Sequence, residues 1–287
     1  METTSATPGI VAVTGAGSGI GLAAALRFGR EHPLVLCDVK TDSLDRTLEH
    51  LRQRGIAASG LTCDVSSLDS TEAFAEAVRR QGQLHVVFHA AGLSPSMAGA
   101  RTLLQVNYLG TANVLDSFHA LLRPGAVTIC IASMSAHRRD LDAFDDLLPD
   151  PRAPGILESL VDAARNQSSV AYALSKRGVI RMVERRARDW AKQGGRIVSI
   201  SPGVVDTPMG RQETGSGGAG NAALAMKNTP LGRYATADEI AAVGEFLCRS
   251  EAGFMTGCDV LVDGGAVAGF RHHATEEARR AWDHPWR

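Results

Sequence analysis

The chain has 287 residues, and its 30 Lys and Arg nearly balance its 31 Asp and Glu, so no overall charge draws it to nucleic acid. Hydrophobic residues make up 44% and charged residues 21%, which excludes a mostly disordered chain. Glycine is the outlier, because 30 glycines in 287 residues exceed the usual share of about 7%. Length alone allows one or two domains.

The cysteines and the N-terminal segment bear on the compartment. The five cysteines are spread out and form no C-x-x-C pair, so we expect neither a disulfide framework nor a metal site. Residues 1–10 have no basic cluster or apolar run typical of a signal peptide. No apolar stretch approaches the ~20 residues that span a bilayer. These observations predict a cytoplasmic protein whose partners include neither a membrane nor nucleic acid.

Short apolar runs alternate along the chain with segments of helical periodicity. The predicted strands are Ile10–Thr14, Leu34–Asp38, Ala58–Cys63, His85–His89, Ala126–Ser133, Arg196–Ser201 and Asp259–Val262. The predicted helices are Ile20–Arg30, Asp42–Arg54, Ser70–Gln81, Asn107–Leu122, Ser169–Gln193 and Thr236–Ser250. This order predicts an α/β fold with a doubly wound, parallel, seven-stranded sheet and helices on both faces. We expect residues 1–287 to form a single domain with a core at 10–265.

Three segments depart from the alternation. Residues 137–168 form an insert rich in Asp and Pro, and residues 204–230 form a lid that contains the flexible run GSGGAG. Both follow strand C-termini, the edge at which open α/β sheets bind ligands. Residues 266–287 form a C-terminal tail. Its Trp282 and Trp286 would pack on a neighbouring subunit, or the tail would be frayed.

A glycine-rich turn follows the first strand. Thr14–Gly21 reads TGAGSGIG and leads directly into a predicted helix. Glycines there allow a tight turn and let backbone N–H groups approach a pyrophosphate at the helix N-terminus. A flexible turn has the same composition, but the strand before it and the helix after it favour a phosphate loop. We therefore predict cofactor contacts from Gly15, Ser18, Gly19, Ile20 and Gly21.

Acidic residues end the second and third strands. Asp38 is placed to accept hydrogen bonds from a ribose and to repel a 2′-phosphate, which favours NAD over NADP. Its alternative is a helix N-cap or solvated loop acid, and Lys40 leaves a minor NADP preference open. Asp64 and Val65 are expected beside the adenine. An ordinary N-cap turn is the alternative for Asp64, and the two roles are compatible.

Tyr172 and Lys176 open the fifth predicted helix. Their spacing of four residues places both side chains on one helix face, with the ammonium near the phenol. A free tyrosine has a pKa of about 10. Its use as a base at neutral pH therefore requires that this pKa fall by about three units, or roughly 4 kcal/mol. The lysine charge and a positive nicotinamide are the kind of groups that supply it. An exposed lysine beside a half-buried tyrosine gives the same pattern by chance.

These motifs occur together in an order that resembles the classical short-chain dehydrogenases/reductases. The motifs are Thr14–Gly21, Ala90–Gly92, Asn107 in VNYLGT, Ser133 in IASMSA, Tyr172 with Lys176, Ser201–Gly203, Thr207–Met209 and Asp263–Gly265. The resemblance covers about residues 10–265 and implies a Rossmann-like nucleotide-binding domain. The insert before Tyr172 is similar to one in the 3α-hydroxysteroid dehydrogenase/carbonyl reductase branch.

The resemblance implies a role for each site residue. Tyr172 would be the general acid/base, and Ser133 would orient the substrate oxygen. Lys176 would bind the nicotinamide ribose and lower the tyrosine pKa, while Asn107 would hold a water that links Lys176 to solvent. Val205 and Thr207 would contact the carboxamide. The remaining expected cofactor contacts are Ala90, Ala91, Gly92, Val106, Pro202 and Gly203.

The substrate side is less constrained. The Ser133 hydroxyl, at the end of a predicted strand, can hydrogen-bond a carbonyl oxygen as hydride arrives. Ser135 would share that face on a continued strand, but the family register leaves it to line the substrate site. Met209, Leu224 and Met226 offer adaptable apolar contacts. We predict an apolar secondary alcohol or ketone, of the steroid, terpenoid or other alicyclic class.

Some positions of the chain depart from the family pattern. His89 stands where the family has an Asn that ties strands together, so we predict a structural role for it. The family assembles through the helices that begin at Asn107 and Tyr172, which implies a homodimer or homotetramer, with the insert covering or enlarging that face.

The alternatives to a hydride-transferring enzyme are a catalytically idle NAD(H)-binding regulator and an epimerase or dehydratase that uses NAD transiently. The intact set of motif residues argues against the regulator.

Overall fold

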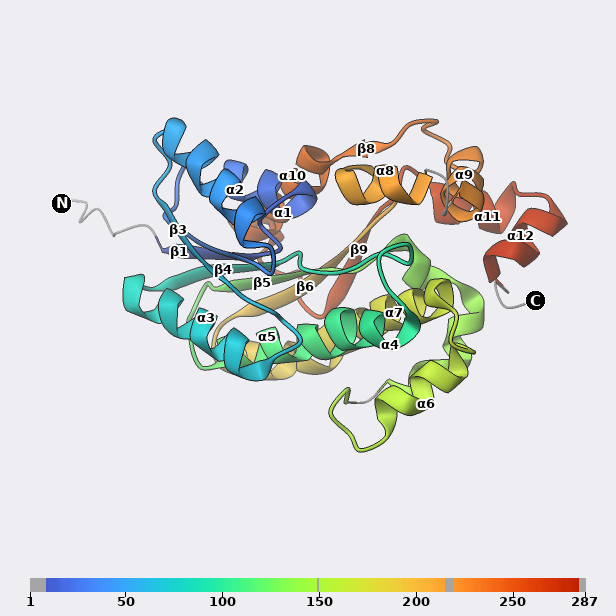
Figure 1. Cartoon of the computed structure of the whole chain (residues 1–287), viewed down its shortest axis with the longest axis horizontal. Coiled ribbons are helices and arrows are strands. Elements are labelled where there is room, and N and C mark those ends of the chain that lie inside the picture. The colour runs from blue at the N-terminus through green and yellow to red at the C-terminus, as the bar shows by residue number, and fades with distance from the viewer. Residues whose placement is uncertain (1–8, 149, 215–218, 284–287) are drawn as a thin grey trace.

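A computed structural model describes residues 9–148, 150–214 and 219–283. Its central sheet has seven parallel strands in the order β3-β2-β1-β4-β5-β6-β9 (Figure 1). These strands are β1 (Ile10–Thr14), β2 (Leu34–Asp38), β3 (Ala58–Thr62), β4 (Leu84–His89), β5 (Val127–Ile131), β6 (Arg196–Pro202) and β9 (Cys258–Val262). A short ribbon pairs β7 (Val205–Asp206) with β8 (Ala235–Thr236). The predicted doubly wound sheet is confirmed, and its order reverses between β1 and β4, where such sheets bind ligands.

Helices cover both faces of this sheet (Figure 1). One layer consists of α1 (Gly19–Phe28), α2 (Thr41–Gln53) and α10 (Ala237–Cys248). The other consists of α3 (Leu68–Gln81), α4 (Ala100–Leu104), the π-helical turn η1 (Gln105–Leu109), α5 (Gly110–His119) and α7 (Ser168–Lys192). Each layer packs a separate apolar core onto the sheet. The five central strands are mostly buried, whereas the edge strands β3 and β9 are more exposed.

Most predicted boundaries lie within a few residues of the observed ones, and two of the differences bear on the site. The helix expected from Asn107 begins at Ala100 and passes through the π turn at Asn107. The fifth strand ends at Ile131 rather than at Ser133. Ser133 instead caps the 3-10 turn η2 (Met134–His137), where its Oγ accepts a hydrogen bond from the Ser135 N–H at 3.2 Å. Ser135 therefore does not lie on a continued strand, because this serine cap ends the extended backbone.

The insert forms ordered structure against the helices expected at the subunit interface. It contains the 3-10 segment η3 (Arg139–Leu147) and α6 (Ile156–Ala163). Asp145 accepts hydrogen bonds from Arg177 of α7, and Arg152 donates to Asn113 of α5 at 2.9 Å. Leu160 is fully buried in the same core as α4, α5 and α7. The insert is thus an integral layer of the fold.

The lid and the tail add helices at one end of the molecule. They comprise α8 (Pro208–Thr214), α9 (Ala219–Lys227), α11 (Ala266–His272) and α12 (Glu276–Asp283). The 3-10 turn η4 (Ser250–Ala252) belongs to neither segment and connects α10 to β9. In Figure 1, α9, α11 and α12 lie together, beyond the carboxyl ends of the strands. Trp282 stacks on Phe270, with ring centroids 4.3 Å apart, so α12 is fixed to α11 of the same chain. Trp282 thus packs within its own chain, whereas the sequence predicted either packing on a neighbouring subunit or a frayed tail. Trp286 lies outside the described residues.

His89, at the end of β4, holds three elements together. Its Nδ1 lies 2.7 Å from Thr14 Oγ1 of β1, and its Nε2 lies 3.0 Å from Thr111 Oγ1 of α5. Thr111 donates its own proton to the Asn107 carbonyl, so it accepts from Nε2–H, which leaves Nδ1 to accept from Thr14. Thr14 Oγ1 in turn accepts from the Ala91 N–H at 3.1 Å. The predicted structural role of His89 is confirmed.

We expect acidification to destabilise the folded protein through His89. Burial, together with the positive charge of Lys176, lowers the pKa of His89 from 6.5 to about 3. The stabilisation is complete above about pH 6.5 and is lost as the pH falls toward 3, at up to about 1.4 kcal/mol per pH unit. Urea unfolding of the wild type and of His89→Asn, between about pH 7.5 and about pH 5, measures this loss. Equal pH slopes for the two proteins would contradict the assignment.

Candidate active site

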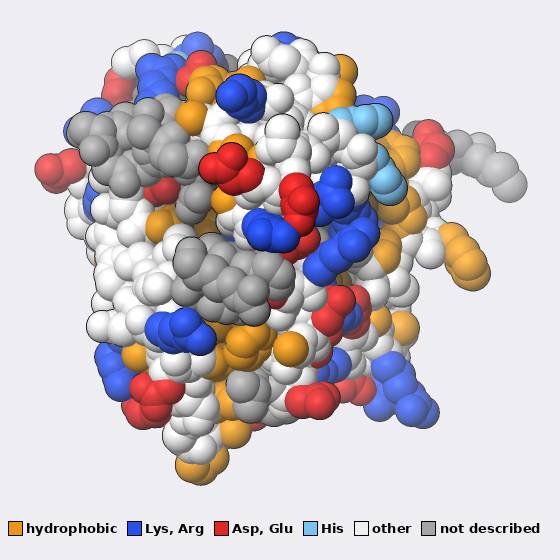
Figure 2. All heavy atoms as spheres, turned by 90° about the vertical axis from the view of Figure 1, so that its right-hand side faces the viewer, with side chains coloured by type: hydrophobic (Ala, Val, Ile, Leu, Met, Phe, Trp, Pro, Cys, Tyr) orange, Lys and Arg blue, Asp and Glu red, His pale blue; other side chains and the backbone are white. Residues whose placement is uncertain are grey.

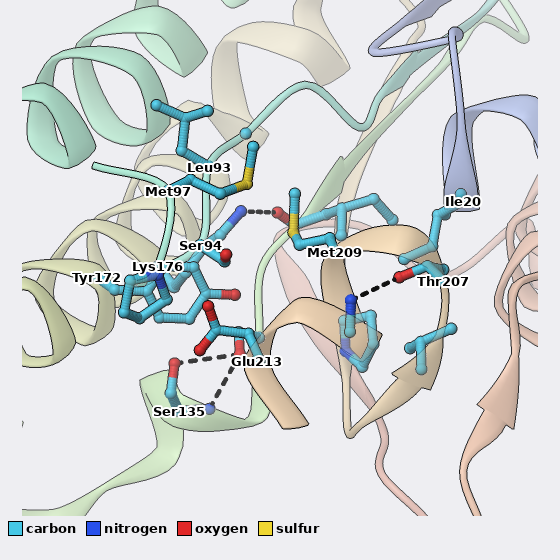
Figure 3. Close-up of a pocket in the computed structure, with 18 of the residues that line it drawn as sticks. Ile20, Leu93, Ser94, Met97, Ser135, Tyr172, Lys176, Thr207, Met209 and Glu213 are labelled. Carbon is cyan, nitrogen blue, oxygen red and sulfur yellow. Dashed lines mark hydrogen bonds between the residues drawn. The ribbon is translucent and has the colours of Figure 1, made fainter. Parts of the chain in front are cut away.

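The predicted site residues surround one cavity at the carboxyl ends of the strands, with a volume of about 940 Å³. Figure 3 shows Tyr172, Lys176 and Ser135 near one end of this pocket and Ile20 with Thr207 near the other. The predicted residues that line it are Gly15, Ser18, Gly19, Ile20, Gly21, Asp38, Asp64, Val65, Ala90, Ala91, Gly92, Val106, Ser133, Ser135, Tyr172, Lys176, Pro202, Gly203, Val205, Thr207 and Met209. Of the residues predicted at the site, Asn107 and Met226 are not part of the wall.

The glycine loop has the geometry of a phosphate cradle. Gly15 and Gly19 have φ angles of +65° and +55°, which favour glycine. A Cβ on Gly21 would lie 2.1 Å from the Gly15 carbonyl oxygen, so only glycine allows the loop to pack on α1. Ser18 caps α1 without a side-chain hydrogen bond, which leaves the first N–H groups of that helix for an anion. The loop therefore fits a dinucleotide pyrophosphate.

Asp38 is held rigidly at the cavity wall. Its Oδ2 accepts a hydrogen bond from the Gly17 N–H, and its Oδ1 accepts one from the Lys40 N–H, both at 2.9 Å. Because Lys40 is the N-cap residue of α2, Asp38 is not the helix cap proposed as its alternative. Asp64 lines the cavity and accepts a hydrogen bond from the Ser66 N–H, but Ser67 rather than Asp64 is the N-cap residue of α3 (Leu68–Gln81).

Tyr172 and Lys176 lie on the first turns of α7. The Lys176 ammonium is buried and donates to the Ile131 carbonyl at 2.8 Å, and it lies 5.9 Å from the Tyr172 ring centroid. Burial lowers the pKa of Lys176 to about 8, so it remains mostly charged at neutral pH. The Ile131 carbonyl occupies one ammonium proton and leaves the others for a ligand.

The protein groups around Tyr172 raise its pKa. Burial is the largest cause, a hydrogen bond with Ser133 acts in the opposite direction, and the charge of Glu213 raises the pKa further. Lys176 is not among the groups that shift this pKa, so the protein groups alone do not supply the predicted lowering. Sequence reasoning counted the ammonium but not the desolvation of the phenolate or the acid on α8. A positive nicotinamide would still act in the predicted direction.

Asn107 acts from behind the cavity wall. Its Nδ2 donates to the Leu93 carbonyl at 3.0 Å, and its Oδ1 accepts from the Leu93 N–H at 2.8 Å. This pair of bonds fixes the backbone just after Gly92. A Cβ on Gly92 would lie 3.2 Å from Asn107 Oδ1 and 3.4 Å from Lys176 Nζ, so glycine lets these groups approach.

Comparisons with known proteins identify the family. Residues 9–141 match the family model described as short chain dehydrogenase, and residues 156–267 match the one described as Enoyl-(Acyl carrier protein) reductase. The short-chain dehydrogenase/reductase bsc3 of Alternaria brassicicola is 33% identical over 261 residues, which cover 89% of this chain and 94% of that protein. The chain is a short-chain dehydrogenase/reductase.

Solved structures of similar proteins agree with this assignment. A 3-alpha-hydroxysteroid dehydrogenase from Pseudomonas sp. B-0831, complexed with NADH, superposes with a TM-score of 0.76 and 26% identity, over 93% of this chain and 100% of that one. A short chain dehydrogenase from Burkholderia cenocepacia J2315, complexed with NADP, has a TM-score of 0.71 and 21% identity, over 89% and 96% of the chains. This short-chain dehydrogenase/reductase thus has a Rossmann-type, nucleotide-binding fold, and these two structural neighbours are complexed with NADH and with NADP.

The lid of this dehydrogenase/reductase brings an acid into the site that the sequence did not reveal. Glu213 of α8 lines the cavity and accepts a hydrogen bond from the Ser96 N–H at 2.9 Å, which joins the lid to the loop after β4. Figure 3 shows Glu213 beside Tyr172. A single acid in a lid helix forms no motif with its chain neighbours, so only the folded structure places it here.

The far wall of the dehydrogenase/reductase also holds residues from the insert and the tail. Arg138, from the insert, is a buried part of the wall. Trp282, from the tail, lines the same cavity.

Within residues 9–148, 150–214 and 219–283, no helix combines the length and hydropathy needed to cross a bilayer.

Proposed function

We propose that this protein transfers a hydride between NAD(H) and an apolar secondary alcohol or ketone of the steroid, terpenoid or other alicyclic class. The observation that carries the proposal is one cavity that joins two sets of residues. Tyr172, Lys176 and Ser133 lie in its wall together with the phosphate cradle and Asp38. Tyr172, Lys176 and Ser133 suit proton transfer at an alcohol. The phosphate cradle and Asp38 suit a dinucleotide whose ribose carries no 2′-phosphate.

The chain's own residues would manage the proton and the oxygen of the substrate. When bound, the nicotinamide would accept or supply the hydride. In alcohol oxidation, Tyr172 Oη takes the hydroxyl proton, and in ketone reduction it returns a proton to the carbonyl oxygen. Ser133 Oγ accepts hydrogen bonds from the Ser135 N–H and from Ser135 Oγ at 3.1 Å, which leaves the Ser133 proton for Tyr172 or the substrate oxygen.

The choice of NAD rests on the rigidity of Asp38. Two backbone N–H groups hold its carboxylate in place, so it cannot swing away from a 2′-phosphate without losing both hydrogen bonds. Each oxygen keeps a lone pair for a ribose hydroxyl. Lys40 also lines the cavity, but its side chain is exposed, so its charge is screened by solvent.

The apolar substrate class rests on the other end of the cavity. Leu93, Met97, Met209, Leu224 and Trp282 contribute apolar surface there, and the methionines adapt to different shapes. The similarity to a 3-alpha-hydroxysteroid dehydrogenase is consistent with this class.

We also propose that the protein forms a homodimer or homotetramer through the face that includes the insert. Sedimentation velocity tests this proposal by giving the mass of the assembly.

Turnover of an alcohol and ketone panel with NAD and NADP tests the proposal. The panel contains steroids, cyclic terpenols, acyl thioesters and sugars, and cofactor absorbance reports hydride transfer. We expect NAD-dependent turnover of alicyclic members. Binding of NADH without any turnover supports the idle regulator instead. Conversion of substrate with no net change in NADH supports an epimerase or dehydratase.

We expect Glu213→Gln to shift the pH profile of alcohol oxidation to lower pH. The negative charge of Glu213 raises the pKa of Tyr172, so its removal lowers that pKa and forms the phenolate at lower pH. Glutamine keeps an oxygen that can accept from the Ser96 N–H. The pH dependence of kcat/KM, compared with that of the exposed control Glu72→Gln, measures the shift. A profile shifted to higher pH would contradict this role.

A further inference from the structure

The lid places one carboxylate beside the groups proposed to react. Glu213 follows Met209 by four residues, so the two side chains share a face of α8, and both line the cavity. Figure 3 shows Glu213 beside Tyr172, with Met209, Leu93 and Met97 around the same pocket. The acid therefore lies in mostly apolar surroundings next to the proposed acid/base.

One oxygen of this carboxylate is available to a ligand. Glu213 Oε1 accepts the hydrogen bond from the Ser96 N–H at 2.9 Å. Oε2 has neither a hydrogen bond nor an ion pair within the part of the chain that the structure describes. Arg211, the nearest cation along α8, pairs with Asp206 instead. Because the Glu213 side chain is only half-buried in the cavity wall, a bound molecule can reach Oε2.

The cations of the cavity are engaged elsewhere. Among the described residues, the cationic side chains that line it are Lys40, Arg138 and Lys176. Lys176 donates to a backbone carbonyl of β5 at 2.8 Å, and Arg138 Nη2 lies 3.7 Å from the Asp140 carboxylate. The Lys40 side chain is exposed after the end of β2. The protein therefore leaves the negative charge of Glu213 without a partner of opposite sign.

The contact between the lid and Ser96 does not require a charge. A neutral amide or hydroxyl oxygen accepts a backbone N–H as a carboxylate does. The charge of Glu213 also raises the pKa of Tyr172, which opposes formation of the phenolate. A positive group bound beside Glu213 would offset this effect. The position of the acid thus favours a cationic ligand next to the reacting oxygen.

We propose that Glu213 binds a protonated amine of the substrate, which is then an alicyclic amino alcohol or amino ketone. This inference rests on the proposed function for the reaction, but not for the binding. Oε2 accepts an N–H of the ammonium group while the substrate hydroxyl or carbonyl oxygen meets Tyr172 and Ser133. A charge-assisted hydrogen bond of this kind is stronger than a neutral one, and the apolar surroundings strengthen it further.

The outer surface of the molecule does not select cations by itself. Over α9, α11 and α12 it mixes basic and acidic side chains with hydrophobic ones (Figure 2). Along the whole chain, Lys and Arg nearly balance Asp and Glu. A preference for an amine must therefore come from Glu213 inside the cavity, so it should depend on this one residue.

Matched bicyclic alcohols test the proposal. Decahydroisoquinolin-8-ol has a ring NH₂⁺ where 1-decalinol has CH₂, and octahydro-1H-isochromen-8-ol has a neutral ether oxygen there. Isothermal titration into the NADH complex measures affinity with no positive nicotinamide present. We expect the wild type to bind the amine at least about tenfold more tightly than either neutral alcohol, in line with a hydrogen bond to a charged group. Glu213→Gln should remove this preference, because glutamine keeps the size of the side chain but not its charge.

A control variant and the ether separate charge from other causes. Glu72→Gln removes an exposed carboxylate of α3 that does not line the cavity, and it should keep the wild-type preference. Equal affinity of the wild type for all three alcohols would overturn the proposal. Binding of the ether as tightly as the amine would overturn it too, because polarity and not charge would then be recognised. A preference that persists in Glu213→Gln would assign the amine to another group.

The same titrations keep this inference apart from the proposed reaction and from a role toward the cofactor. If the wild type selects the amine and Glu213→Gln does not, the amine site stands even where no hydride transfer occurs, and only the proposed function fails. If Glu213 serves only the positive nicotinamide, Glu213→Gln weakens the binding of NAD relative to NADH while the wild type binds the three alcohols alike. That result would overturn the amine site.

Discussion

Tyr172→Phe should lower kcat/KM for alcohol oxidation by about 10³-fold or more while leaving the affinity for NADH unchanged. The substitution removes only the phenolic oxygen that accepts the substrate proton, and a positioned acid/base contributes about 10²–10⁴-fold to such a reaction. The ring stays in place on α7, so the cofactor pocket keeps its shape. Cofactor absorbance measures the rate, and NADH fluorescence titration measures the binding.

Tyr108→Phe is the matched control for this experiment. Tyr108 is fully buried in η1, and its hydroxyl has no hydrogen-bond partner in the described part of the chain. The ring packs over Gly178 of α7, where a Cβ would lie 2.4 Å from it, and it does not line the cavity. Loss of this hydroxyl should leave the rate unchanged. Retained activity in Tyr172→Phe would contradict its role as the acid/base.

The fold could be predicted from the sequence where one physical cause dominates. Buried parallel strands need continuous apolar runs, and the glycine loop needs positive φ angles at Gly15 and Gly19, so both are visible in the residues themselves. The predicted end of β5 was too late because the Ser133 hydroxyl caps a turn. A serine is compatible with a strand and with a turn cap, so the residue type alone does not distinguish them. The π turn at Asn107 likewise leaves no trace in helical periodicity.

The site could be predicted only as far as its motifs extend. The motif residues follow strand ends, so the sheet itself brings them together at one edge. Glu213, Arg138 and Trp282 come from the lid, the insert and the tail, and only tertiary packing places them at the cavity. The rise in the Tyr172 pKa that the protein groups cause was missed for a similar reason. Spacing reveals a neighbouring charge, whereas desolvation depends on everything that surrounds the group.

Asp38→Asn should raise the ratio of NADP to NAD activity by about 10²–10³-fold. Asparagine keeps an oxygen for the Gly17 N–H but removes the charge that would face a 2′-phosphate. Two charges about 4 Å apart in a partly buried site repel by about 4 kcal/mol, and each 1.4 kcal/mol corresponds to about tenfold. Part of the gain is lost because the loop presents no fixed cation to the phosphate. The measurement is kcat/KM for each cofactor with one alcohol at low ionic strength.

Asp64→Asn separates cofactor choice from a general effect on the adenosine end of the cavity. Asp64 lines the same region but sits at the tip of β3, where its Oδ1 accepts from the Ser66 N–H at 2.9 Å. Because the proposed contact of Asp64 is with the base, which is identical in both cofactors, its loss should change both activities alike. Wild-type turnover that is equal or better with NADP would overturn the role of Asp38. The fixed carboxylate would then bind backbone N–H groups alone, and Lys40 would be the residue that meets the 2′-phosphate.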